Sequence, residues 1–169
     1  MGQDTEKRRQ LIGRMSGHLL EHGLAGSGLR ALARSAGTSD RMLLYYFADK
    51  DELLAAVFRH LGEQLQARLA ADVPVNRVDA DRLLETLWAQ SQDREVQRHS
   101  TLLVEMAAAA VRHGEPYSHA AQVIAAHFQD WIAAHLDLDS DAERRRAAYR
   151  IMATLDGMAL LRALGIDPP

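Results

Sequence analysis

The sequence predicts an all-α fold of about nine helices. Apolar residues recur every three or four positions through most of the 169-residue chain, which is the period of an amphipathic helix. Strand-like alternation of apolar and polar residues is absent, and aromatic residues, which favour strands, make up only 5% of the chain. We expect a three-helix unit over residues 1–50 and a helical bundle over residues 51–169, with a long connecting helix over 50–71.

Four helices are predicted before residue 72. The first spans residues 5–22 and ends at Gly23, because glycine commonly stops a helix. Two short helices follow over 28–35 and 39–47, and the turn between them is Ala36-Gly37-Thr38. Asp49, with Glu52 three residues later, forms an Asp version of the capping box and opens the long helix.

The second half of the chain is predicted to hold four longer helices. Pro74 lies in the segment 72–76, which we take as the main connection between the halves. Helices are expected near 79–92 and 98–113, with a short turn of helix between them, and then over 116–135 and 141–164. Ser140 and Glu143 form a capping box at the start of the last helix.

Composition excludes several classes of protein. The chain has no cysteine, which excludes disulfide frameworks, thiolate zinc sites and cysteine nucleophiles. No apolar run is long enough to span a bilayer and the N-terminus is polar, so we expect a cytoplasmic protein with no membrane partner.

One pattern suggests catalysis, because His18-Leu-Leu-Glu21-His22 has the spacing of one class of zinc peptidases. A zinc site needs a third ligand and a cleft, so we favour a solvated helix end and predict no catalytic residue, metal or cofactor.

The net charge of −3 is unevenly distributed along the chain. Residues 1–50 hold eight Lys and Arg against five Asp and Glu, whereas residues 51–169 hold twelve against eighteen. A basic head on an acidic body is typical of a nucleic-acid-binding module joined to a domain that does not bind nucleic acid. Chance, combined with an arginine-rich composition, is the alternative.

Residues 27–50 have the organisation of a helix-turn-helix, in which a second short helix enters the major groove of DNA. The matching positions are Leu32-Ala33, Ala36-Gly37, Leu43, Phe47, Lys50 and Leu53. With these residues, segment 28–54 resembles the DNA-binding signature of the TetR family of bacterial transcriptional regulators. The resemblance implies an N-terminal helix-turn-helix DNA-binding domain and a C-terminal domain for ligand binding and dimerisation.

The function that this resemblance implies is a repressor that a small apolar ligand releases from a palindromic operator. Its expected partners are double-stranded operator DNA, a second copy of the chain and an unidentified small-molecule effector. Three alternatives stay open: a constitutive regulator without an effector, a helical adaptor that does not bind DNA, and a zinc hydrolase that uses the segment 18–22.

The second short helix must bury Leu43 and Phe47, which leaves its other side chains free to approach DNA. Arg41 is the best base reader, because its planar fork can pair with O6 and N7 of guanine. Asp40 either accepts a hydrogen bond from cytosine or is a first-turn acid favoured by the helix dipole. The predicted base-reading residues are Arg30, Asp40, Arg41, Met42 and Leu44.

A second group of residues is predicted to hold the DNA backbone. These residues are Ser27, Tyr45, Tyr46 and Lys50. Lys50 stands at the start of the long helix, whose free N–H groups can add a phosphate site. For Tyr46 the alternative is packing against the core. Lys7, Arg8 and Arg9 either touch the DNA backbone or form a solvated charged end.

The resemblance implies that residues 79–113 surround a small-molecule cavity. The candidate ligand contacts are Leu84, Trp88, His99, Leu103 and Met106, although plain core is the alternative for such a stripe. His99 is polar within an apolar stripe, so we expect it to orient the ligand.

The last two helices carry apolar stripes at coiled-coil spacing. The resemblance implies that two such helices from each of two chains form a four-helix interface. The predicted interface residues are Tyr117, Ala121, Ile124, Phe128, Trp131, Ala148, Ile151, Leu155 and Met158. Ordinary core within a single chain is the alternative for this stripe.

Overall fold

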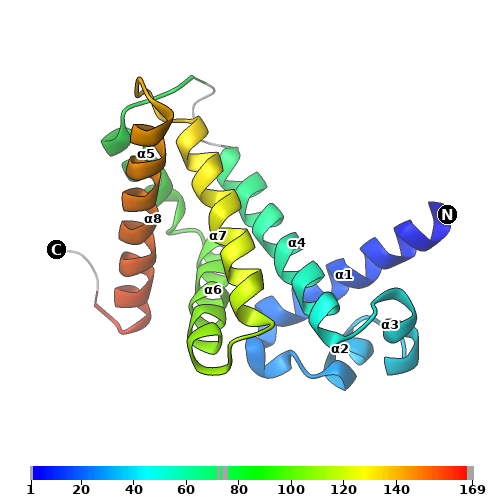
Figure 1. Cartoon of the computed structure of the whole chain (residues 1–169). Coiled ribbons are helices and arrows are strands. Elements are labelled where there is room, and N and C mark those ends of the chain that lie inside the picture. Colours follow the sequence, from blue (N-terminus) through cyan, green and yellow to red (C-terminus); the bar gives the residue numbers. More distant parts are fainter. Residues whose placement is uncertain (1, 72, 74–75, 167–169) are drawn as a thin grey trace.

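The computed structural model describes residues 2–71, 73 and 76–166, and this part of the chain is helical apart from turns and one isolated β-bridge between Val78 and Leu136 (Figure 1). The α-helices are α1 (Gly2–His22), α2 (Leu29–Ser35), α3 (Asp40–Tyr46), α4 (Lys50–Ala70), α5 (Ala80–Gln90), α6 (Arg94–His113), α7 (Tyr117–Ala134) and α8 (Asp141–Ala163). A short 3₁₀ helix, η1 (Leu24–Gly26), follows α1. The predicted all-α fold class is confirmed.

Side-chain caps start the helices where the sequence signals them. The hydroxyl of Ser39 accepts a hydrogen bond from Met42 N–H at the start of α3. The carboxylate of Asp49 accepts one from Glu52 N–H at the start of α4. Ser140 opens α8 with a complete capping box. Each cap satisfies an N–H group that has no partner inside its own helix.

The predicted turn of helix between residues 92 and 98 is wrong. The Oδ1 atom of Asp93 accepts hydrogen bonds from Glu95 N–H at 2.9 Å and Val96 N–H at 3.2 Å, and α6 therefore begins at Arg94. Residues 91–93 alone connect α5 to α6. The ninth helical element of the described chain is instead η1, between α1 and α2.

Helix α4 takes part in two apolar clusters. Its first half, from Leu53 to Leu61, packs with α1, α2, α3 and the side chains of Leu102 and Met106. Its far end, with Leu65 and Leu69, packs with α5, α7 and α8. In Figure 1, α1–α3 gather at one end of the molecule and α5 and α8 at the other, with α4, α6 and α7 between them. Movement of α4 would therefore be felt at both ends.

The predicted interface stripe on the last two helices faces the core of the chain itself. Ala148 and Ile151 are buried in the second cluster, where Phe128, Trp131 and Leu155 pack against it. Tyr117, Ala121 and Ile124 pack against the first cluster, and Met158 is half-buried. The periodicity correctly identifies an apolar face, but α4, α5 and α6 cover most of it.

Candidate DNA-binding surface and ligand pocket

The turn between α2 and α3 is built around Gly37. Its φ of +68° lies in the left-handed region, which favours glycine. From α1, the Nη1 atom of Arg14 donates to the carbonyl oxygen of Ala36 at 3.1 Å, and an added Cβ at Gly37 would lie 3.0 Å from the same nitrogen. The first helix therefore fixes the turn that sets α3 against α2.

Helix α3 buries one side and exposes apolar groups on the other. Leu43 and the capping residue Phe47 are buried in the first cluster. Arg41, Met42 and Leu44 are exposed, and Tyr45 is 69% exposed. Exposed large apolar side chains concentrated on one short helix indicate a surface that contacts another molecule.

Two of the predicted base readers face each other. The Nε atom of Arg30 lies 3.9 Å from Oδ2 of Asp40, and the Arg30 side chain is almost fully exposed. An exposed pair at this distance contributes little to stability, so both groups are free to exchange partners.

The four residues predicted to touch phosphates occupy different environments. Lys50 begins α4 and is partly exposed, and Tyr45 is exposed. Tyr46 packs against the first cluster and meets the Tyr45 ring edge-on, with 5.1 Å between ring centroids. Ser27 is only 7% exposed, so its side chain does not belong to the exposed surface of α3.

Arg8 and Glu52 clamp the end of α3, a role that spacing in the sequence does not reveal. An ion pair of 2.9 Å joins them, and the Arg8 guanidinium lies 4.6 Å from the centroid of the Phe47 ring. The other Glu52 oxygen accepts a hydrogen bond from Ala48 N–H at 2.6 Å. The capping box predicts that the Glu52 side chain bonds Asp49 N–H. In the structure, the Glu52 side chain instead bonds Ala48 N–H and pairs with Arg8 of α1.

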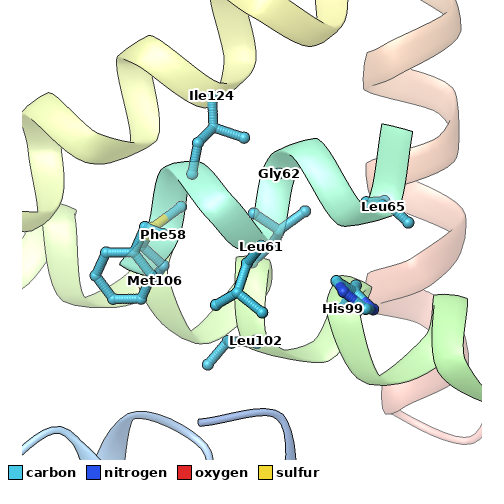
Figure 2. Close-up of a pocket in the computed structure, with 9 residues that line it drawn as sticks. Phe58, Leu61, Gly62, Leu65, His99, Leu102, Met106 and Ile124 are labelled. Atoms are coloured by element: carbon cyan, nitrogen blue, oxygen red, sulfur yellow. The ribbon is translucent and has the colours of Figure 1, made fainter. Parts of the chain in front are cut away.

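A small pocket lies between α4, α6 and α7 (Figure 2). Its lining residues are Phe58, Leu61, Gly62, Leu65, His99, Leu102, Leu103, Met106 and Ile124. The pocket thus contains His99, Leu103 and Met106 of the five predicted ligand contacts. The other two lie elsewhere: Leu84 packs against the second cluster, and the Arg162 guanidinium covers Trp88 at 4.5 Å from its ring centroid.

The pocket is small, and its one polar side chain is His99. The free space is about 10 Å³, which is room for about one water molecule. His99 is only 7% exposed, and its Nδ1 lies 2.7 Å from the main-chain oxygen of Glu95. Its Nε2 is buried and has no hydrogen-bond partner among the described residues. A polar atom left unpaired in an apolar pocket is a candidate ligand contact.

The comparisons with known proteins agree with this arrangement. The family model described as bacterial regulatory proteins of the tetR family matches residues 19–57, which span α2, α3 and the start of α4. The HTH-type transcriptional regulator PksA of Bacillus subtilis is 28% identical over 163 residues, covering 93% of this chain and 79% of PksA.

Solved structures share the fold along most of the chain. A transcriptional regulator from Rhodococcus sp. Rha1 superimposes with a TM-score of 0.70 at 26% identity, covering 90% of this chain and 81% of that one. The chain belongs to the TetR family. The multidrug binding protein EbrR, complexed with proflavin, has the same fold, with a TM-score of 0.69 at 24% identity and coverage of 94% and 89%. We conclude that the chain is a TetR-family helix-turn-helix transcriptional regulator.

In this TetR-family chain, α6 also touches the segment that precedes α2. The Oε2 atom of Glu105 accepts a hydrogen bond from Leu24 N–H at 2.6 Å, across 81 positions of sequence. Gly23 makes room for the carboxylate, because an added Cβ would lie 2.6 Å from the same oxygen. Glu105 stands on the same helix as His99 and Met106, so one helix joins the pocket to η1, the segment directly before the helix-turn-helix.

The side chains of His18 and His22 in α1 stack on each other. Their ring centroids lie 4.3 Å apart, and His22 Nδ1 is 3.1 Å from the main-chain oxygen of His18. Across residues 2–71, 73 and 76–166, no group of three or more His, Cys, Asp and Glu side chains is placed to hold a metal ion. None of the described helices is long and apolar enough to cross a membrane.

Proposed function

We propose that this regulator is a repressor whose dimer binds a palindromic operator and releases it when a small, mostly apolar molecule enters the pocket. The observation that carries the proposal is the position of α6, which lines the pocket through His99 and Met106 and bonds η1, directly before the helix-turn-helix, through Glu105. In this proposal residues 1–50 form the DNA-binding domain and residues 51–169 the regulatory and dimerisation domain. Helix α4 is the second link, because it contributes to both apolar clusters.

The exposed side of α3 supports the DNA-binding part of the proposal. Arg41 reads guanine in the major groove, and Arg30, Asp40, Met42 and Leu44 flank it. Tyr45 and Lys50 hold phosphates at the end of α3 and the start of α4. We leave Ser27 out of this set because its residue is buried.

The dimer interface of the proposal lies on the outer faces of α7 and α8. Apart from those on α3, the exposed large apolar residues of the described chain gather mainly on α8 and directly after it: Tyr149, Leu160, Leu161, Leu164 and Ile166. Leu164 is 68% exposed and Tyr149 is 65% exposed. Val123 is exposed on α7, which packs beside α8, and we assign these two outer faces to a second copy of the chain.

Binding of a ligand in the pocket would lower the affinity of the chain for DNA by displacing α6 and α4. The pocket now has room for about one water molecule, so a larger guest must push the surrounding helices apart. A shift of α6 strains the bond between Glu105 and Leu24, and a shift of α4 moves Lys50 and the neighbouring Phe47. Since both recognition helices must fit one DNA site, a ligand that prefers the shifted state lowers operator affinity, and DNA lowers ligand affinity equally.

Binding of the whole chain to DNA upstream of its own gene tests this function. Footprinting should show a pseudo-palindromic site that two chains protect. The double variant Leu160→Asp with Leu164→Asp should sediment as a monomer and lose the footprint, whereas Val111→Asp, on the exposed side of α6, should retain both. The proposal is contradicted if the unaltered chain binds the upstream DNA no more tightly than unrelated DNA, or if the unaltered chain is a monomer.

A constitutive regulator without an effector is the second candidate, and the small size of the pocket favours it. A set of small apolar molecules, screened by thermal shift and then by operator titration, separates the two functions. Stabilising molecules that leave operator affinity unchanged support the constitutive regulator.

A further inference from the structure

His99 presents one bonded ring nitrogen and one free ring nitrogen to its surroundings. Nδ1 lies 2.7 Å from the main-chain oxygen of Glu95, one turn earlier in α6. Nε2 is buried without a hydrogen-bond partner in the described chain. Figure 2 shows the ring on the side of α6 that faces α4, and the eight other lining residues have apolar side chains or, at Gly62, none. No lining side chain can pair with Nε2.

The bond to Glu95 fixes the tautomer of the ring. A carbonyl oxygen only accepts hydrogen bonds, so Nδ1 must carry the proton. In the neutral imidazole, Nε2 is then an acceptor with an unused lone pair. The lining side chains therefore offer one hydrogen-bond acceptor and no donor.

We infer that the effector is a neutral, mostly apolar molecule that donates one hydrogen bond to His99 Nε2, as a phenol or an alcohol does. The inference rests on the proposed function and narrows its ligand class. An ether, ester or ketone without a donor would set a second acceptor against Nε2 and leave both unpaired. A carboxylate or phosphate would meet a lone pair in place of a cation, and an ammonium group would bury a charge with a single acceptor.

The walls of the pocket set the size of the first probes. Where Gly62 of α4 faces α7, an added Cβ would lie 3.3 Å from Cγ2 of Ile124. Only apolar side chains must move to enlarge the space beside His99, and such contacts repack at a modest cost. Molecules with a single ring are therefore suitable probes.

Phenol, toluene and anisole separate the donor from shape and size. Phenol and toluene have nearly the same shape, and anisole has an acceptor but no donor. In calorimetric titrations of the whole chain, phenol should bind about tenfold more tightly than toluene or anisole. His99→Phe should abolish this preference for phenol while toluene still binds.

Nitrogen NMR of the histidine rings gives a measurement that needs no variant. In the unaltered chain, the His99 signals should show a protonated Nδ1 and an unprotonated Nε2. Phenol should move the Nε2 signal toward that of a hydrogen-bonded nitrogen as it saturates the site, and toluene should not. This readout decides the question even if His99→Phe does not fold.

The outcomes separate the ligand class from the proposed function. Three results would overturn the assignment of a hydrogen-bond donor to the effector: equal affinities for the three probes, a protonated Nε2, or an Nε2 signal that phenol does not move. These results would still allow a ligand to bind in the pocket. If phenol binds most tightly but does not lower the affinity for the operator, the donor assignment is supported. That result contradicts the proposal that a ligand releases the regulator from DNA. If none of the probes binds at millimolar concentration, both the ligand class and the pocket are rejected.

Discussion

Different forces hold the DNA-binding end and the pocket of this regulator together. At the recognition end (η1, α2, α3 and the first turn of α4), hydrogen bonds to charged side chains join distant segments: Arg8 to Glu52, Arg14 to the Ala36 carbonyl, and Glu105 to Leu24 N–H. Around the pocket, apolar side chains of α4, α6 and α7 meet without such bonds, and His99 keeps one nitrogen unpaired. Directional bonds allow one arrangement, whereas apolar contacts can repack. One end can therefore keep its shape while the other adapts to a guest.

Gly23→Ala should have the largest effect, because it strains the recognition end in two ways. Gly23 has a φ of +65° and a ψ of −167°, which is nearly exclusive to glycine, and a Cβ there would displace the Glu105 carboxylate. We expect a loss of about 3 kcal/mol in the free energy of unfolding, or roughly 6–12 °C in Tm by calorimetry. The control is Gly28→Ala, at a glycine with negative φ and no atom within 4 Å of an added Cβ. Similar losses in both variants would mean that Glu105 does not hold this segment.

Arg41→Ala and Lys50→Ala should distinguish base reading from phosphate contact at the recognition end. Loss of Arg41 should cost about 1–3 kcal/mol of operator binding and relax the preference at one base pair in each half-site. Loss of Lys50 should weaken binding to all sequences alike and reduce the salt dependence of affinity. Fluorescence anisotropy with operator and scrambled DNA at several salt concentrations measures both effects. An equal loss of specificity from both changes contradicts the assigned roles.

Glu105→Ala and Glu105→Gln test whether the charge of Glu105 holds α6 to the segment before α2. The alanine variant leaves Leu24 N–H without its acceptor, which should cost about 1–3 kcal/mol of stability. The glutamine variant keeps an acceptor but loses the charge, so its loss should be about half as large. Hydrogen exchange at Leu24 should speed up in the same order. Unchanged exchange in the alanine variant would show that the bond contributes nothing.

Gly62→Ala applies the same chemical change as Gly23→Ala at the pocket, where we expect little loss. Alanine favours a helix interior by about 1 kcal/mol over glycine, and the contact with Ile124 opposes that gain. The Tm should therefore stay within about 2 °C of the unaltered chain. Gly17→Ala in α1 is the matched control, because an added Cβ there has no neighbour within 4 Å. A Tm loss as large as that of Gly23→Ala would show that the pocket walls cannot repack.

Local signals in the sequence were sufficient for most helices but not for their partners. Ser39, Asp49 and Ser140 start helices because their side chains bond N–H groups within three residues. Asp93 acts in the same way, and this cap starts α6 at Arg94, before the predicted start at residue 98. Contacts across long stretches of chain are different, since nothing near Glu105 or Leu24 indicates the bond between them.

The pocket and the predicted interface stripe show the same limit. His99 was singled out correctly as a polar residue on the pocket side of α6, because periodicity assigns it to a buried face. Trp88 belongs to a similar stripe, but Arg162, which also bonds the Ser91 carbonyl, covers it. Periodicity likewise found the apolar faces of α7 and α8 without showing that the chain itself covers them. The spacing of residues shows which face of a helix a side chain occupies. Only the tertiary structure shows which other element or molecule covers that face.

Asp156→Asn should have the smallest effect. Among the described residues Asp156 has no ion pair, whereas Asp93 is paired with Arg68. Asp156 is an exposed residue, but the surrounding protein partly desolvates its carboxyl and raises the pKa of Asp156 above its usual value. The folded state therefore holds the proton more tightly than the unfolded state, so ionisation of Asp156 lowers stability at neutral pH. The asparagine variant should melt slightly higher at pH 7, and its advantage should shrink as the pH falls through the raised pKa. Asp93→Asn should show the opposite sign, because hydrogen bonds from the Arg68 side chain and from Val96 N–H lower the pKa of Asp93 and stabilise the fold above its unfolded pKa. Melting curves of the three proteins between pH 4 and pH 7 measure both trends, and parallel curves for the two variants would contradict this assignment of their charges.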